Sequence, residues 1–225
     1  MAIREITRST FKQLHEQFQS YDPKFVIFRG VKNANYELVA CAGRMKIRQE
    51  FARRDIEQLI LKTFKERSVP FVLSKPSNDW EWLALAQHHG LPTRLLDWTQ
   101  NPLVATYFAV RTEHNGPSAI YVLNHETIIA EPEDWPNPLD IGGIPMRYIP
   151  NHVTPRIIAQ SGLFTFHPSP ERPYVEGNFD KLIIPERFKK KIKTELYQYG
   201  FHQASMFPGL DGLAEHIKWM NEESY

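Results

Sequence analysis

The chain has 225 residues, of which 42% are hydrophobic and 24% charged, and its 27 basic and 26 acidic residues leave a formal net charge of +1. This hydrophobic content allows a substantial buried core. The net charge is far from the strongly basic charge that is typical of general nucleic-acid binders. The start of the chain shows no signal-peptide pattern and no stretch is long and apolar enough to span a bilayer, so we expect a cytoplasmic protein without a membrane partner. A single cysteine, Cys41, excludes an internal disulfide and a cysteine-based metal cluster.

Helices dominate the elements predicted in the first half of the chain. Apolar residues at helical spacing predict helices over residues 9–19, 53–68, 78–89 and 101–113. In the second of these, four side chains are expected on one apolar face: Ile56, Leu59, Ile60 and Phe64. Gly90 and Pro92 end the third helix, while Asn101 and Pro102 begin the fourth as cap and first residue. Residues 24–30, KFVIFRG, predict a short buried strand.

The second half of the chain combines strands, loops and two more helices. Short apolar runs predict strands at residues 118–124, at 156–167 with a turn at Ser161-Gly162, and at 181–185. The Pro-, Gly- and Asn-rich residues 131–155 predict an irregular excursion. Helices are expected over 186–200 and 211–224, and three residues of the last one are expected to be buried: Leu213, Ile217 and Met220. Together the elements predict one α+β domain over residues 1–225, with a mixed or mainly antiparallel sheet flanked by helices.

Arg29 and Gly30, at the end of the first buried strand, are the first candidate for a binding site. The planar arginine fork suits a carboxylate or phosphate, and glycine permits close approach of a backbone or a ligand. The structural alternative is an ion pair between Arg29 and an aspartate, with Gly30 serving only as a turn.

The stretch QHHGLPTRLLDWTQNP, residues 87–102, concentrates polar groups among apolar neighbours, which indicates a partly buried segment. Adjacent side chains on a helix point about 100° apart, so His88 and His89 do not suit one metal ion, and no carboxylate stands at zinc-site spacing. We therefore expect no metal. Asp97 is expected to pair with Arg94 or Arg29.

Two interpretations of this stretch remain open. Its polar groups form an internal salt-bridge corner, or they converge on an anion beside the N-terminus of the helix that begins at Pro102, where free N–H groups and the helix dipole favour negative charge. The second interpretation assigns the anion to five residues: Arg29, His88, His89, Thr93 and Arg94. Arg156, Gln160 and His167 form a later polar group, in which His167 alone is more typical of a structural histidine.

Four segments together resemble the FRG domain family, which is named for its Phe-Arg-Gly motif. They are FRG at 28–30, WLALAQHHGLPTRLLDWTQNPLVATYFA at 82–109, RIIAQSGLFTFHP at 156–168 and MFPGLDGLA at 206–214, so the resemblance spans about residues 24–219. It departs at residues 37–44, ELVACAGR, where Arg44 is kept and a Pro-Ser pair of the family pattern is missing. The family occurs in bacteria and phages, sometimes beside mobile or defence elements, and the resemblance implies a shared pocket without a named reaction.

The order of FRG, TRLLDWT and LVATYFA is also distantly similar to that of ADP-ribosyltransferases. This similarity implies a pocket for a nucleotide such as NAD. The glutamate that those enzymes carry on a later strand has no counterpart here, and the nearest residue, Gln160, lacks the negative charge.

Three functions are consistent with these patterns, and none indicates a particular cofactor. The first is a pocket for a phosphate-bearing nucleotide such as NAD, open to ADP-ribosyl transfer or NAD hydrolysis. Its substrate-binding residues would be Arg29, Gly30, Thr93, Arg94 and Gln160, and its catalytic residues His88, His89 and Asp97. The second is a non-catalytic module of a defence or mobile-element system with a protein or nucleic-acid partner, and the third is a metal-independent nuclease that uses the two histidines.

Overall fold

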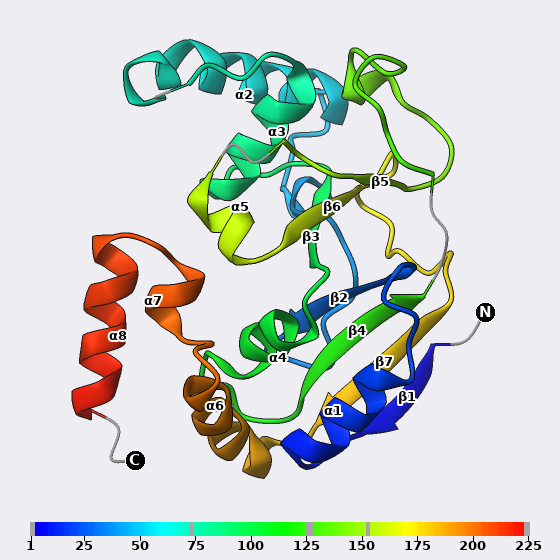
Figure 1. The fold of residues 1–225 in the computed structure, drawn as a ribbon. Coiled ribbons are helices and arrows are strands. Elements are labelled where there is room, and N and C mark those ends of the chain that lie inside the picture. Colours follow the sequence, from blue (N-terminus) through cyan, green and yellow to red (C-terminus); the bar gives the residue numbers. More distant parts are fainter. Residues whose placement is uncertain (1–2, 73, 125–127, 152–153, 223–225) are drawn as a thin grey trace.

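The computed structural model describes residues 3–72, 74–124, 128–151 and 154–222. Its centre is a seven-stranded mixed sheet in the order β1-β7-β4-β2-β3-β6-β5 (Figure 1). The strands are β1 (Arg4–Thr7), β2 (Val26–Val31), β3 (Leu95–Thr99), β4 (Ser118–Asn124), β5 (Met146–Tyr148), β6 (Gly162–Phe166) and β7 (Phe179–Ile184). β1 and β7 pair in parallel and the other neighbours are antiparallel, which confirms the predicted α+β class with a mixed sheet.

The helices lie around this sheet. They are α1 (Phe11–Gln19), α2 (Arg53–Ser68), α3 (Asp79–His88), α4 (Pro102–Val110), α5 (Pro155–Ala159), α6 (Lys189–Gln198), α7 (Gln203–Met206) and α8 (Leu210–Glu222). One core cluster joins α1, α4 and α6 to β2, β4 and β7, and another joins α2 and α3 to β3, β5 and β6. Figure 1 shows these two groups as the lower and upper halves of the molecule.

The sheet divides between β2 and β3. β2 pairs with β4 along its whole length, and β3 does the same with β6, but β2 and β3 share only the pair Phe28–Thr99. Beyond this pair the two strands diverge. The fold therefore leaves a gap in its central sheet that side chains must fill or line.

Gly30 of β2 lies directly against helix α4. A Cβ atom built at this position would stand 1.8 Å from the carbonyl oxygen of Ala105, so no side chain fits. The glycine thus permits the close approach of a strand and a helix, and this contact sets the position of α4 beside the gap.

Three strands were not expected from the sequence, namely β1, β3 and β5, and one expected strand is wrong in part. The strand expected over 156–167 is helix α5 followed by β6, because Thr154 caps the helix through its hydroxyl and Pro155 occupies the first helical position. The turn at Ser161-Gly162 is present, with Ser161 at a φ of 46°. The stretch expected to be irregular, 131–155, contains β5, and its residues 152 and 153 lie outside the described residues.

The buried faces of two helices also differ from expectation. In α2, Leu59 is exposed, whereas Glu57 and Leu61 are buried. In α8 the three residues expected to be buried are 45%, 51% and 38% exposed: Leu213, Ile217 and Met220. An adjacent side of α8 packs instead, because Gly212 admits the backbone of Phe207 where a Cβ atom would lie 1.8 Å from its carbonyl oxygen, and His216 follows one turn later. Residues 223 and 224 of the expected helix lie outside the described residues.

Within the described part of the chain, every helix is too short or too polar to cross a membrane.

Candidate functional site

A cleft of about 260 Å³ opens where β2 and β3 diverge. Helix α4 contributes one wall, with Val104 and Phe108, and Leu163 and Phe164 of β6 contribute another. Six of the polar side chains that line it come from four elements or their ends: Arg29, Gln87, His88, Asp97, Arg156 and Gln160. The cleft thus combines apolar walls with a small number of polar groups, which is the usual make-up of a small-molecule site.

A chain of hydrogen bonds crosses the gap in the sheet. The Nη1 atom of Arg29 donates to the main-chain oxygen of Asp97 at 2.6 Å and to its carboxylate at 3.4 Å. Gln87 donates its amide to the same carboxylate at 3.0 Å and accepts from the hydroxyl of Thr93 at 2.8 Å. Of the two partners expected for Asp97, the structure therefore shows Arg29 and not Arg94. The carboxylate stays well exposed to the cleft, so these bonds orient it without enclosing it.

His88 stands at the C-terminal end of α3, half-buried at the edge of the cleft. Burial, followed by the positive charge of Arg156 and the neighbouring His89, lowers the pKa of its imidazole to about 4, against the opposing effect of Asp97. His88 is therefore neutral at pH 7. In this form one ring nitrogen accepts a proton or a hydrogen bond and the other donates.

Arg156, in the first turn of α5, brings positive charge to the cleft. Its guanidinium lies 4.5 Å from the centroid of the Phe207 ring. Burial lowers the pKa of Arg156, and Asp97 opposes that shift. Arginine nevertheless stays protonated in proteins, so a cation faces the cleft.

The structure gathers five of the residues predicted for the site, namely Arg29, Gly30, His88, Asp97 and Gln160. Two of them also have structural duties. Gly30 admits α4, and Gln160 donates its amide to the main-chain oxygen of Met206 at 2.8 Å, which ties α5 to α7.

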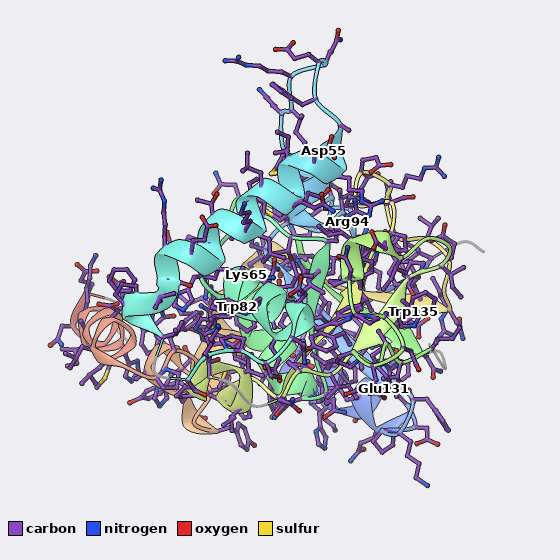
Figure 2. The ribbon with its side chains drawn as sticks, turned by 90° about the horizontal axis from the view of Figure 1, so that it is seen from above. Asp55, Lys65, Trp82, Arg94, Glu131 and Trp135 are labelled. Carbon is purple, nitrogen blue, oxygen red and sulfur yellow. The ribbon has the colours of Figure 1, made fainter. Side chains whose placement is uncertain are left out.

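Three predicted residues lie outside the cleft. Arg94 is buried and donates to Glu57 of α2 at 2.5 Å and to the main-chain oxygen of Pro168 at 2.8 Å. Seen from above, it lies beside the N-terminal part of α2, near Asp55 (Figure 2). Thr93 is buried behind Gln87, and His89 is exposed with its ring 4.8 Å from that of His88. Arg94 thus belongs to an internal ion pair, as the structural interpretation of this stretch supposed.

Two of the polar lining residues, Gln87 and Arg156, were not among the predicted site residues. Gln87 and Arg156 reach the cleft because α3 ends, and α5 begins, at the divergence of the strands. Both stand in segments that carry the family resemblance, which was the available signal. His167, by contrast, is buried, bonds to Thr165 at 2.7 Å and has its pKa lowered by burial to about 3, which fits the structural interpretation.

Among the described residues, no three His, Cys, Asp or Glu side chains lie close enough together to hold a metal ion.

Comparison with protein families agrees with the resemblance suggested by the Phe-Arg-Gly motif at residues 28–30 of β2. Residues 24–117 match the model of a family described as the FRG domain. The chain contains an FRG domain. The matched segment of this FRG domain supplies Arg29, His88, Asp97 and the α4 wall, while Arg156 and Gln160 lie beyond it. No curated protein and no solved structure matches the chain.

Proposed function

We propose that the cleft of this FRG domain protein binds a phosphate-bearing nucleotide of the NAD type. The observation that carries the proposal is Arg156, a cation that lines an apolar-walled cleft. Among the described residues, none forms a hydrogen bond or an ion pair with its guanidinium. Arginine forks suit phosphate oxygens, and apolar and aromatic walls suit a planar ring.

The size of the cleft restricts how such a ligand sits. A volume of about 260 Å³ lies just below the range of about 300–1,000 Å³ that is usual for small-molecule sites. One ring-bearing half of a dinucleotide therefore occupies the cleft, and the rest extends along the surface from Arg156. Arg29 adds a second positive charge on the β2 side.

The groups in the cleft suit cleavage of the bond between ribose and nicotinamide. In that reaction the nicotinamide leaves with the bonding electron pair, and a water or acceptor oxygen adds at the ribose carbon. Asp97 is the one carboxylate among the described lining residues, and it would face the positive charge that develops on the ribose. His88, neutral at pH 7, would accept the proton of the attacking oxygen.

Ligand-dependent thermal unfolding tests the binding proposal. NAD or ADP-ribose at a hundred times its dissociation constant should add about 2.7 kcal/mol of stability, a shift of about 5–10 °C for a chain of this size. The shift should vanish in Arg156→Met. It should persist in Arg187→Met, because the exposed Arg187 also lies over a phenylalanine ring, at 4.9 Å, but stands outside the cleft.

Absence of a shift with NAD, ADP-ribose, ATP and phosphate alike would contradict the proposal. If NAD binds, release of free nicotinamide tests the chemistry. Asp97→Asn and His88→Gln should each stop that release while NAD binding continues.

A second function, a protein-interaction module, is favoured by a different observation. The apolar face of α8 formed by Leu213, Ile217 and Met220 is exposed, and its spacing matches helix-in-groove recognition. If this face binds a protein, Ile217→Glu should abolish that association while leaving NAD binding unchanged. Sedimentation of the chain as a monomer at all concentrations would exclude self-association as the mode.

A further inference from the structure

Two arginines share one aromatic ring next to the cleft. The guanidinium of Arg111, just after the end of α4, lies 4.7 Å from the centroid of Phe207, and that of Arg156 lies 4.5 Å from it. Arg111 also lies 5.3 Å from the ring of Phe108, a residue of the cleft wall. Segments far apart in sequence thus bring two positive charges to the same place.

Neither charge is in a direct ion pair among the described residues, although Asp97 acts on Arg156 from beyond ion-pair distance. Among the described residues, no Asp or Glu oxygen lies within ion-pair distance of either guanidinium. Among the described residues, the Nη1 atom of Arg111 is buried from solvent and has no hydrogen-bond partner. Burial and the positive charge of Arg111 lower the pKa of Arg156, whereas the Asp97 carboxylate raises it.

Packing alone explains this arrangement poorly. Cation–π contact contributes about 0.5–2 kcal/mol, and the C-terminal end of the α4 dipole favours a cation at Arg111. Arg156, however, is half-buried and lies near a like charge. Two adjacent cations are most readily stabilised by an anion that contacts both.

The two arginines also connect two hollows of the molecule. Arg156 lines the cleft, and Arg111 lines a second cavity of about 490 Å³ between α4, α6, α7 and α8. A ligand whose ring occupies the cleft would therefore pass its phosphates from Arg156 toward Arg111.

We propose that Arg111 and Arg156, which both contact the ring of Phe207, form a clamp for a diphosphate group of the bound nucleotide. The proposal rests on the proposed function and adds to it the substrate class, a nucleoside diphosphate derivative, and a further binding residue, Arg111. Phe207 is a positioning residue, because it touches both arginines and orients their forks.

Titration calorimetry with AMP, ADP, phosphate and pyrophosphate tests the clamp. In the wild type the second phosphate should tighten binding about tenfold to a hundredfold, the gain expected for one or two additional charge-assisted hydrogen bonds. Arg111→Met should remove that gain and leave AMP affinity within about twofold, whereas Arg111→Lys should keep part of it because it keeps the charge but loses the fork. Arg187→Met, the matched control, should keep all of it.

The stability of the unliganded variant separates this role from a structural one. Arg111→Met should melt close to the temperature of the wild type, because the lost cation–π contacts are offset by removal of a buried unpaired group and a like-charge repulsion. A much lower melting temperature, with the ADP-over-AMP gain intact in the folded fraction, would overturn the clamp.

The outcomes also distinguish the two proposals. If AMP and ADP bind the wild type equally, the clamp is wrong and the nucleotide site stands. If pyrophosphate binds through Arg111 but no nucleotide binds, the clamp stands and the proposed function is wrong. If none of the four probes binds, both are wrong.

Discussion

Arg94 and Arg156 show how the surroundings of two arginines decide whether their role is structural or open to a ligand. Arg94 meets the buried carboxylate of Glu57 and becomes part of the framework. Arg156 meets an aromatic ring and a cleft. A buried charge requires a partner, so the arginine whose partner lies within the chain is the structural one, and the other is available to a ligand.

Replacement of Arg94 should therefore affect stability far more than binding. Arg94→Met leaves Glu57 as an unpaired buried charge, and removal of one partner of such a pair costs about 3–5 kcal/mol. Urea denaturation measures this loss. The double variant Arg94→Met/Glu57→Leu should recover most of it, and a single variant as stable as the wild type would contradict the pair's role.

The acidity of His88 offers a second test at this scale. His88 should titrate with a pKa near 4 in an NMR experiment. The pKa should rise in Arg156→Met, because Arg156 repels the imidazolium, and fall in Asp97→Asn, because Asp97 attracts it. The folded-state value lies below the ordinary value of 6.5, so the unfolded chain takes up this proton first as the pH falls. His88 should consequently contribute to a loss of stability between about pH 6.5 and pH 4. A titration midpoint near 6.5 would show that the site is more hydrated than the structure implies.

At the scale of elements, the contact between β2 and α4 sets the cleft. Gly30→Ala should destabilise the protein by at least about 2 kcal/mol, because the added Cβ overlaps the carbonyl oxygen of Ala105 and forces strand and helix apart. The matched control is Gly142→Ala, since a Cβ atom there meets nothing within 4 Å. Comparable melting temperatures for the two variants would show that α4 can shift away from β2 at little cost in stability, and that the wall of the cleft can move with it.

At the scale of the molecule, the sheet consists of two parts joined at one residue pair and by the bond from Arg29 to Asp97. Strands β1 to β7 span most of the chain, and we propose that residues 1–225 fold as one domain around them. The gap between β2 and β3 is the feature that a ligand in the cleft would bridge.

Hydrogen exchange tests this view of the whole sheet. Amides of β3 on the side of the gap should exchange faster than those of β4, which is paired on both sides. Arg29→Met should speed exchange in β3 and leave β4 nearly unchanged, because it removes the side-chain bond across the gap. Uniform protection across β2, β3 and β4 would contradict the division.

The sequence alone determined the elements whose local signals agree with their packing. Helix α4 has a cap at Asn101 and a proline in its first turn, and β2 and β4 have continuous apolar runs, so their positions were confirmed. The motif residues Arg29, His88, Asp97 and Gln160 were also recognisable as a candidate site from the sequence. Arg29 and His88 suit an anion, Asp97 was expected to pair with Arg29 or Arg94, and the resemblance to the FRG domain family implied a shared pocket.

Only the tertiary structure decided which of these residues meet. It placed Arg94 against Glu57 and turned the apolar face of α8 outward, because backbone contact at Gly212 outweighed the hydrophobic pattern. It also brought Arg111 and Arg156 to one ring, although 45 positions separate them. Local spacing constrains a helix face or a strand, but contacts between distant segments depend on how the sheet divides and where α4 packs against it.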